Sequence, residues 1–146
     1  MPPRHFQYTP PGAFPGMRIG LPFLPITLVN YSCAISALAL VDSGSTVSVL
    51  PYDVGLQLGL KWDEQTVPTP LVGSLKHAQA WGVQIIGEVT PFSPVVLKFA
   101  WTQVTSERVP LILLGQTNFF QAFDVCFSGS QQVFEIAAKG ALIRTI

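Results

Sequence analysis

Apolar residues in this chain occur mostly in short runs, and glycine or proline separates most of these runs. Short runs bounded by turn residues are typical of β-strands. The pattern predicts strands over residues 21–29, 33–41, 46–50, 95–104, 110–114, 124–127 and 132–136. Short helical turns are expected over 51–60 and 116–123, and the segment 64–86 contains runs that could pair as a hairpin. The pattern therefore predicts an all-β (mainly β) fold, a barrel of short strands with one or two short helices.

The run over residues 33–41 is apolar on both of its faces. A strand of this composition is expected to be buried on both sides. It lies in a stretch without charge between Arg18 and Asp42, which is long enough to span a bilayer. Prolines in the first part and a polar Asn-Tyr-Ser break in the middle favour two strands joined by a turn. No membrane span is therefore expected.

The length of 146 residues fits one domain. Residues 1–17 are rich in proline and glycine and are expected to form an extended N-terminal arm, followed by a single domain over residues 18–146. The N-terminus lacks the unbroken apolar region of a secretory signal, which predicts a cytoplasmic protein.

The charge is balanced, with eight basic and eight acidic residues, and charged residues make up only 11% of the chain. Soluble domains average about 25%. This composition argues against nucleic-acid binding, which needs clustered positive charge. The mean hydropathy of +0.44 predicts that a partner covers part of the surface.

The residue types that bind metals are sparse. Cys33 and Cys126 are far apart in the sequence, and neither His5 nor His77 shares a ligand spacing with them. We expect two free thiols, buried or half-buried, and no metal or cofactor.

The sequence Asp42-Ser43-Gly44-Ser45 directly follows the apolar run that ends at Val41. Such a turn presents a carboxylate at the end of a buried strand, a position suited to proton transfer. Alone the signal is weak, because Asp-Ser-Gly is also ordinary turn chemistry.

The surrounding sequence resembles the retropepsin-like aspartic proteases, the single-lobed relatives of pepsin. Residues 39–45 resemble the catalytic Asp-Thr/Ser-Gly-Ala/Ser motif, and residues 22–26 resemble the entry strand before it. Residues 49–51 and 58–60 are similar to the segment that follows the motif. Residues 112–125, which begin Ile-Leu-Leu-Gly, are similar to the hydrophobic-hydrophobic-Gly motif and short helix that pack beneath the catalytic loop in the family.

The resemblance implies an aspartic endopeptidase with a retropepsin-like closed barrel. Its mechanism needs two carboxylates that share one proton. Of the four aspartates only Asp42 is followed by Ser-Gly, so the second carboxylate is expected from Asp42 of a second copy in a symmetric homodimer. We expect Asp53, Asp63 and Asp124 to face solvent or to cap turns.

The family assigns Asp42 as the catalytic acid and base, and Ser43 as a hydroxyl that links the two catalytic loops across the dimer. Gly44 lets the backbone approach the substrate, a polypeptide in extended conformation. A hydroxyl at Ser45 can bond the carboxylate, so Ser45→Ala is expected to move the activity optimum to higher pH.

The β-hairpin flap of the family is placed over residues 70–81 and closes on the peptide. Its substrate-binding residues would be Val72, Gly73, Ser74 and Leu75. The final segment, 140–146, is either a dimer-interface strand or an edge strand within one subunit.

Two alternatives to the protease stay open. One is a catalytically silent retropepsin-like dimer that binds peptides or a protein partner. The other is a β-barrel module in which Asp-Ser-Gly is only a turn.

Overall fold

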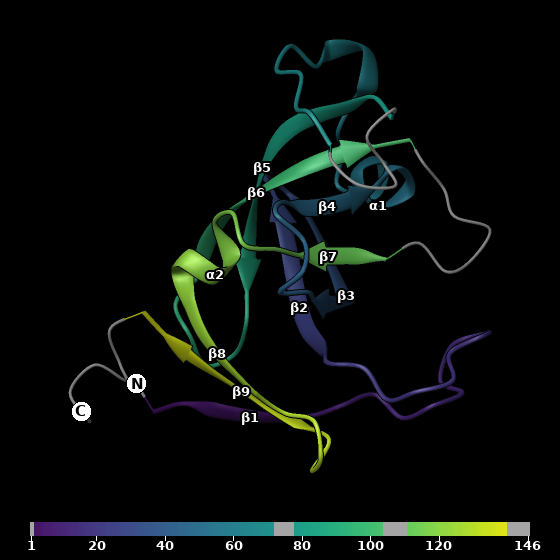
Figure 1. Cartoon of the computed structure of the whole chain (residues 1–146). Helices are drawn as coiled ribbons and strands as arrows, with labels where there is room; N and C mark the ends of the chain where they lie inside the picture. Colours follow the sequence, from purple (N-terminus) through teal and green to yellow (C-terminus); the bar gives the residue numbers. More distant parts are fainter. Residues whose placement is uncertain (1, 72–77, 104–110, 140–146) are drawn as a thin grey trace.

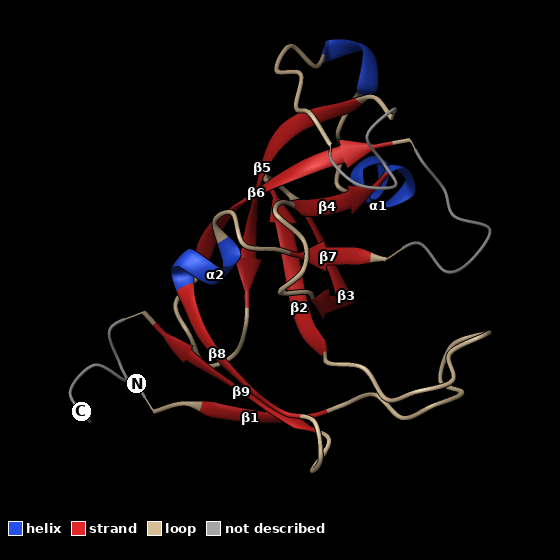
Figure 2. Cartoon of the chain, in the orientation of Figure 1, coloured by secondary structure: helices blue, strands red, loops and turns tan. Residues whose placement is uncertain are grey.

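A computed structural model describes residues 2–71, 78–103 and 111–139 of the chain (Figure 1). Within these residues the fold is mainly β, with few short helices (Figure 2). The strands are β1 Arg4–Gln7, β2 Phe23–Asn30, β3 Cys33–Val41, β4 Ser48–Pro51, β5 Ala80–Glu88, β6 Val95–Thr102, β7 Ile112–Leu114, β8 Phe123–Ser128 and β9 Val133–Ala138. The helical elements are α1 Tyr52–Gln57, the 3-10 turn η1 Trp62–Glu64, and α2 Phe119–Ala122.

Six strands close into a barrel in the order β2-β3-β7-β4-β6-β5. The closed barrel with few short helices confirms the fold class predicted from the sequence. A separate three-stranded sheet, ordered β1-β9-β8, is formed by the two ends of the described chain. Figure 1 shows this sheet at one end of the molecule, away from η1.

The charge-free stretch between Arg18 and Asp42 forms the antiparallel hairpin of β2 and β3, as the sequence predicted. Its turn lies at Tyr31, which has a φ of 51° and a side chain that is 96% exposed. In the described part of the chain, no helix is long and apolar enough to cross a membrane.

Strand β7 positions the turn at Asp42, because it pairs with both β3 and β4. It runs parallel to β3, with Val41 opposite Leu114, and antiparallel to β4. Parallel neighbours end at the same edge of a sheet. The residues that follow β3 and β7, Asp42 and Gly115, are therefore brought together although they are far apart in the sequence.

One hydrophobic core, to which the barrel, α2 and the small sheet all contribute, is filled by large apolar side chains. The largest fully buried ones are Trp101, Phe99, Phe119, Phe134, Leu24, Leu28, Leu50, Leu58, Ile85, Leu97, Leu114 and Ile136. Trp101 also donates its indole N–H to the carbonyl oxygen of Tyr52 at 3.2 Å, which satisfies its polar atom inside the core. Helix α1 fits against this ring because Gly55 has no side chain, and a Cβ there would lie 2.1 Å from Trp101 Nε1.

Within the segment expected to form an N-terminal arm, residues 4–7 form β1 and belong to the small sheet. Strand β1 pairs with β9, and the buried ring of Phe6 stacks on Phe134 with a centroid distance of 5.3 Å. On the same two strands, Nε2 of His5 lies 3.0 Å from Oε2 of Glu135. The Pro- and Gly-rich residues 8–22 then lead to β2.

Two expectations about burial are wrong. In β3 only Ala39 and Val41 are buried, and Leu38 is 42% exposed, although burial on both faces was predicted. Alternate residues of β3 point to the outside of the barrel, and no described element packs over them there. Cys33 and Cys126 are free thiols, but Cys126 is exposed, since β8 is an edge strand of the small sheet.

Candidate active site

Asp42 is half-buried and begins a tight turn at the end of β3. Its Oδ1 atom accepts a hydrogen bond from the backbone N–H of Gly44 at 2.9 Å. Its own backbone N–H donates to the carbonyl oxygen of Leu114 at 2.9 Å, which continues the pairing of β3 with β7. The N–H of Ser45 donates to the Asp42 carbonyl oxygen at 3.2 Å and closes the turn. The position of the carboxylate is therefore fixed by backbone contacts on both sides.

The segment after β7 supports this turn from beneath. The backbone N–H of Gln116 donates to Ser45 O at 2.8 Å, and its side-chain amide donates to Ser43 O at 2.8 Å. Thr117 donates both its backbone N–H and its hydroxyl to Thr46 O, at 2.9 and 2.6 Å. Four hydrogen bonds thus hold the carbonyl oxygens of the loop, so its shape depends on residues 116 and 117.

Gly115 is where the two segments approach most closely. A Cβ atom at this position would lie 2.4 Å from Val47 O and 2.7 Å from Ser45 O, so only glycine fits. The buried hydroxyl of Ser48 accepts the N–H of Gly115 at 3.0 Å. These contacts agree with the expectation that the Ile-Leu-Leu-Gly segment packs beneath the Asp-Ser-Gly loop.

The two serines of the loop have different surroundings. Ser43 and Gly44 are exposed, and Ser45 is half-buried. The Ser45 hydroxyl donates to Val47 O at 2.6 Å, whereas the sequence suggested that it bonds the Asp42 carboxylate. A hydroxyl has one proton to donate, so the pH shift expected for Ser45→Ala loses its physical basis.

The hairpin expected over residues 70–81 is described only at its base. Thr69 N donates to Ala80 O at 2.9 Å and Gly82 N donates to Val67 O at 2.7 Å, so residues 67–69 run antiparallel to the start of β5. The proposed substrate-binding flap residues Val72, Gly73, Ser74 and Leu75 lie outside the described residues, as does His77. The flap stays a prediction.

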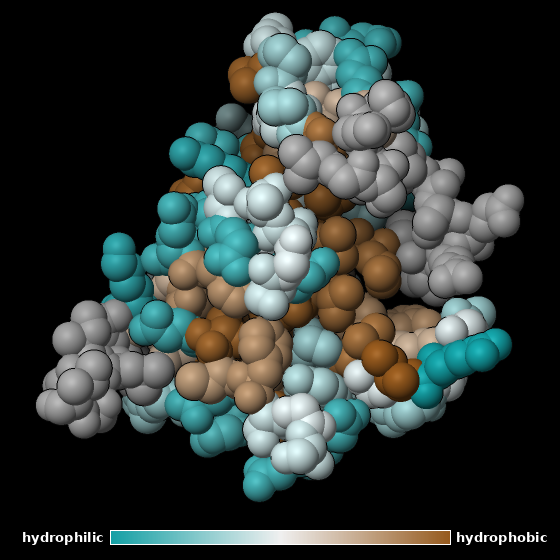
Figure 3. All heavy atoms as spheres, in the orientation of Figure 1, coloured by the Kyte–Doolittle hydropathy of each residue, from teal (hydrophilic) through white to brown (hydrophobic). Residues whose placement is uncertain are grey.

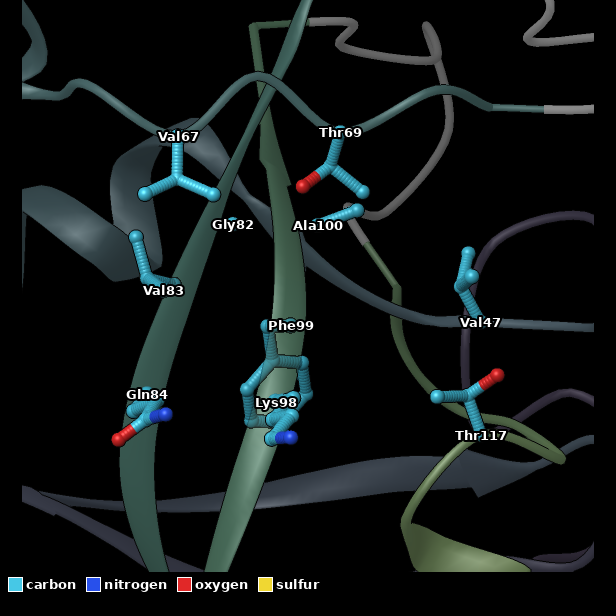
Figure 4. A pocket seen from close by; sticks show the side chains of 10 residues that line it. All are labelled: Val47, Val67, Thr69, Gly82, Val83, Gln84, Lys98, Phe99, Ala100 and Thr117. Atoms are coloured by element: carbon cyan, nitrogen blue, oxygen red, sulfur yellow. The ribbon is translucent and has the colours of Figure 1, made fainter.

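A hollow of about 490 Å³ lies between the base of this hairpin, the outer side of β5 and β6, and the catalytic loop (Figure 4). In Figure 4, Val47 and Thr117 form one side and Gln84 and Lys98 lie on the other. Sequence reasoning did not identify these four residues. Thr117 follows the Leu-Leu-Gly motif closely, and this proximity was the only signal in the sequence.

The remaining candidates take no part in the loop. Asp53, Asp63 and Asp124 are exposed, as expected. Trp101 is in the core, and Trp81 is half-buried beside Trp62 at a centroid distance of 6.1 Å. Among the described residues there is no cluster of three or more His, Cys, Asp or Glu side chains that could hold a metal ion.

No model of a protein family matches the sequence, and no curated protein matches it significantly. Among solved structures, the chain is similar to the crystal structure of a retropepsin-like aspartic protease from Rickettsia conorii. The two share 12% sequence identity with a TM-score of 0.61, and the match covers 92% of this chain and 91% of that one. The similarity therefore extends over most of both chains. This chain has the fold of the retropepsin-like aspartic proteases.

Proposed function

We propose that the protein is an aspartic endopeptidase that works as a homodimer, with Asp42 of each copy in one shared site. The observation that carries this proposal is the Asp42 turn. It follows β3 directly after the buried Val41, is fixed on the segment after β7, and occurs in a chain with the retropepsin-like fold.

A two-fold symmetric pair would bring two Asp42 carboxylates together on the axis. One proton is then shared, because like charges so close cannot both ionise. The unprotonated carboxylate removes a proton from a water molecule, whose oxygen attacks the peptide carbonyl carbon. The other carboxyl gives its proton to the carbonyl oxygen. When the C–N bond breaks, one carboxyl gives its proton to the amine nitrogen, while the other carboxylate takes a proton from a hydroxyl of the tetrahedral intermediate, which restores the shared proton.

The remaining parts of the proposal concern the dimer and the substrate. The exposed Ser43 hydroxyl would link the two loops, and exposed Gly44 would leave room for the substrate backbone. Large hydrophobic side chains at the surface include Ile19, Leu38 and Leu111. Figure 3 shows hydrophobic atoms at the surface where Figure 1 places β7, as a face that meets a second copy would require. The hairpin over residues 70–81 would act as the flap.

The test is cleavage of a diverse peptide pool by wild type, by Asp42→Asn, and by Asp53→Asn as the matched control at an exposed aspartate. We expect the wild type and the control to cut and Asp42→Asn to lose cleavage, with all three sedimenting as dimers. Asparagine keeps the shape of the side chain but cannot exchange the proton. Equal cleavage by Asp42→Asn would refute the proposal. Binding without cleavage by a folded wild-type dimer would favour the silent peptide-binding module instead.

The cytoplasmic location stays a prediction from the N-terminal sequence.

A further inference from the structure

The outer side of β5 and β6 carries a row of paired side chains. In the antiparallel register Gly82 lies opposite Ala100, Gln84 opposite Lys98, and Ile86 opposite Val96. Residues two apart on a strand share a face, so these three pairs lie on one side of the sheet. Ile86 and Val96 face each other and are exposed at 40% and 52%, so they form a small apolar patch on this side of the barrel.

Two hollows lie along this row, and Gln84 lines both of them. The first is the hollow of about 490 Å³ beside the catalytic loop (Figure 4). The second, of about 390 Å³, is bordered by Val29, Tyr31, Ile86 and Val96. Because they share Gln84, we treat them as one continuous surface and call it the β5–β6 groove.

The chemistry of the groove is uneven along its length. The apolar residues of its first part are Val47, Val67, Val83, Phe99 and Ala100, and the polar ones are Thr69, Gln84, Lys98 and Thr117. Its far part is lined by the four residues named above together with Asn30, Gln84 and Ile85. Among the described residues of its lining, Lys98 is the one charged side chain, it is exposed, and it forms no ion pair with any described residue. Lys98 lines the first hollow, and on its face of β6 it stands between Ala100 of that hollow and Val96 of the second. A positive charge between two apolar side chains is complementary to a negative charge between two apolar groups.

The groove begins beside the catalytic loop and leads away from it. Val47 belongs to the loop that starts at Asp42, and Thr117 holds that loop through Thr46 O. From there the groove passes Lys98 and ends near the β2–β3 turn at Tyr31. A polypeptide bound at Asp42 could therefore continue into the groove with residues that are not themselves cleaved.

We propose that the β5–β6 groove is an exosite for the substrate. The groove binds a segment of the substrate away from the scissile bond, and this segment has an apolar, an acidic and an apolar side chain at alternate positions. The spacing follows from the strand, since alternate residues on β6 are about 7 Å apart and an extended peptide repeats at the same interval. This inference rests on the proposed endopeptidase function, because it names the kind of polypeptide that the same site would process.

The experiment compares three substrates with one cleavable core. The first is the core alone, the second adds a segment of the pattern Leu-x-Glu-x-Leu, and the third replaces its Glu by Gln. For wild type we expect kcat/KM about tenfold higher for the Glu substrate than for the Gln substrate at low salt, and a smaller difference at high salt. Lys98→Glu should abolish this preference and leave cleavage of the core alone unchanged. Lys139→Glu, at another exposed lysine, is the matched control and should behave as wild type.

A second variant tests the apolar part of the groove. Ile86→Thr combined with Val96→Thr keeps β-branched residues at these exposed strand positions, so the barrel should fold. It should lower kcat/KM for both long substrates and spare the core alone.

The outcomes separate this inference from the proposed function. If wild type cleaves none of the substrates, the endopeptidase proposal fails, and binding of the fluorescently labelled Glu and Gln segments then decides on the groove. If the core and both long substrates are cleaved equally and Lys98→Glu changes nothing, the exosite is refuted while the protease stands. If Lys98→Glu instead changes the sedimenting mass, the groove is a contact between copies and the exosite is likewise refuted.

Discussion

The substitution Gly115→Ala tests how the catalytic loop is supported. The added methyl group would lie 2.4 Å from Val47 O and 2.7 Å from Ser45 O. Ordinary contact between such atoms begins about 1 Å further away. Both oxygens belong to the backbone and cannot rotate aside, so the loop has to move away from β7 as a unit.

The cost has two parts. Inserting a methyl group into a packed site costs about 1–3 kcal/mol. A shift of the loop also weakens the hydrogen bonds from Gln116 N to Ser45 O and from Thr117 N to Thr46 O, at about 0.5–1.5 kcal/mol each. We therefore expect Gly115→Ala to lower the free energy of unfolding by about 2–4 kcal/mol, and the melting temperature by roughly 4–16 °C for a domain of this size. If the protein is the endopeptidase proposed above, a misplacement of about 1 Å at Asp42 would also lower kcat by about a hundredfold.

Denaturant unfolding of Gly115→Ala is best compared with that of Gly129→Ala. Gly129 lies in the β8–β9 turn, and beyond its chain neighbours no heavy atom lies within 4 Å of the place that the added methyl group would take. Its substitution should therefore change stability by less than about 0.5 kcal/mol. Peptide cleavage measured on the same samples separates a displaced loop from an unfolded protein. Equal unfolding midpoints for the two variants would refute the view that close approach at Gly115 holds the loop.

Three further measurements probe the same framework. Ser48→Ala should lower the free energy of unfolding, measured in urea, by about 1–3 kcal/mol. The buried N–H of Gly115 donates to the Ser48 hydroxyl and would lose its partner. Leu58→Ala should cost about 2–5 kcal/mol at a fully buried position, while Leu56→Ala, at a side chain that is 45% exposed on α1, should cost much less. Under native conditions a thiol reagent should label exposed Cys126 faster than half-buried Cys33, and equal labelling rates would contradict the structure.

The parts of the fold that the sequence predicted are those set by local chemistry. The polar break after Asn30 indicated the β2–β3 turn, and the apolar run before Asp42 indicated a strand that ends at Val41. Glycine and proline mark turns through their own backbone preferences, which do not depend on distant contacts. The helix expected over residues 116–123 is shorter, since residues 116 and 117 bind the catalytic loop instead of continuing α2.

The errors concern features set by distant parts of the chain. Leu38 is as apolar as its neighbours, and only the absence of a described element over that face of β3 leaves it exposed. The Ser45 hydroxyl had two acceptors within a few residues, and the shape of the loop, held by Gln116, directs it to Val47 O. Periodicity and composition do not contain such information.

The β5–β6 groove is likewise a feature that the sequence alone does not predict. Lys98 lies in an otherwise mostly apolar strand, and the sequence alone indicates only a side chain that faces solvent. Its proposed role rests on the register with Gln84 and on the hollow that Val47 borders on the side of the Asp42 loop. A motif identifies the residues that carry out a reaction, because the chemistry restricts their types. The residues that choose among substrates need only shape and charge, so register and topology, rather than a motif, bring them together.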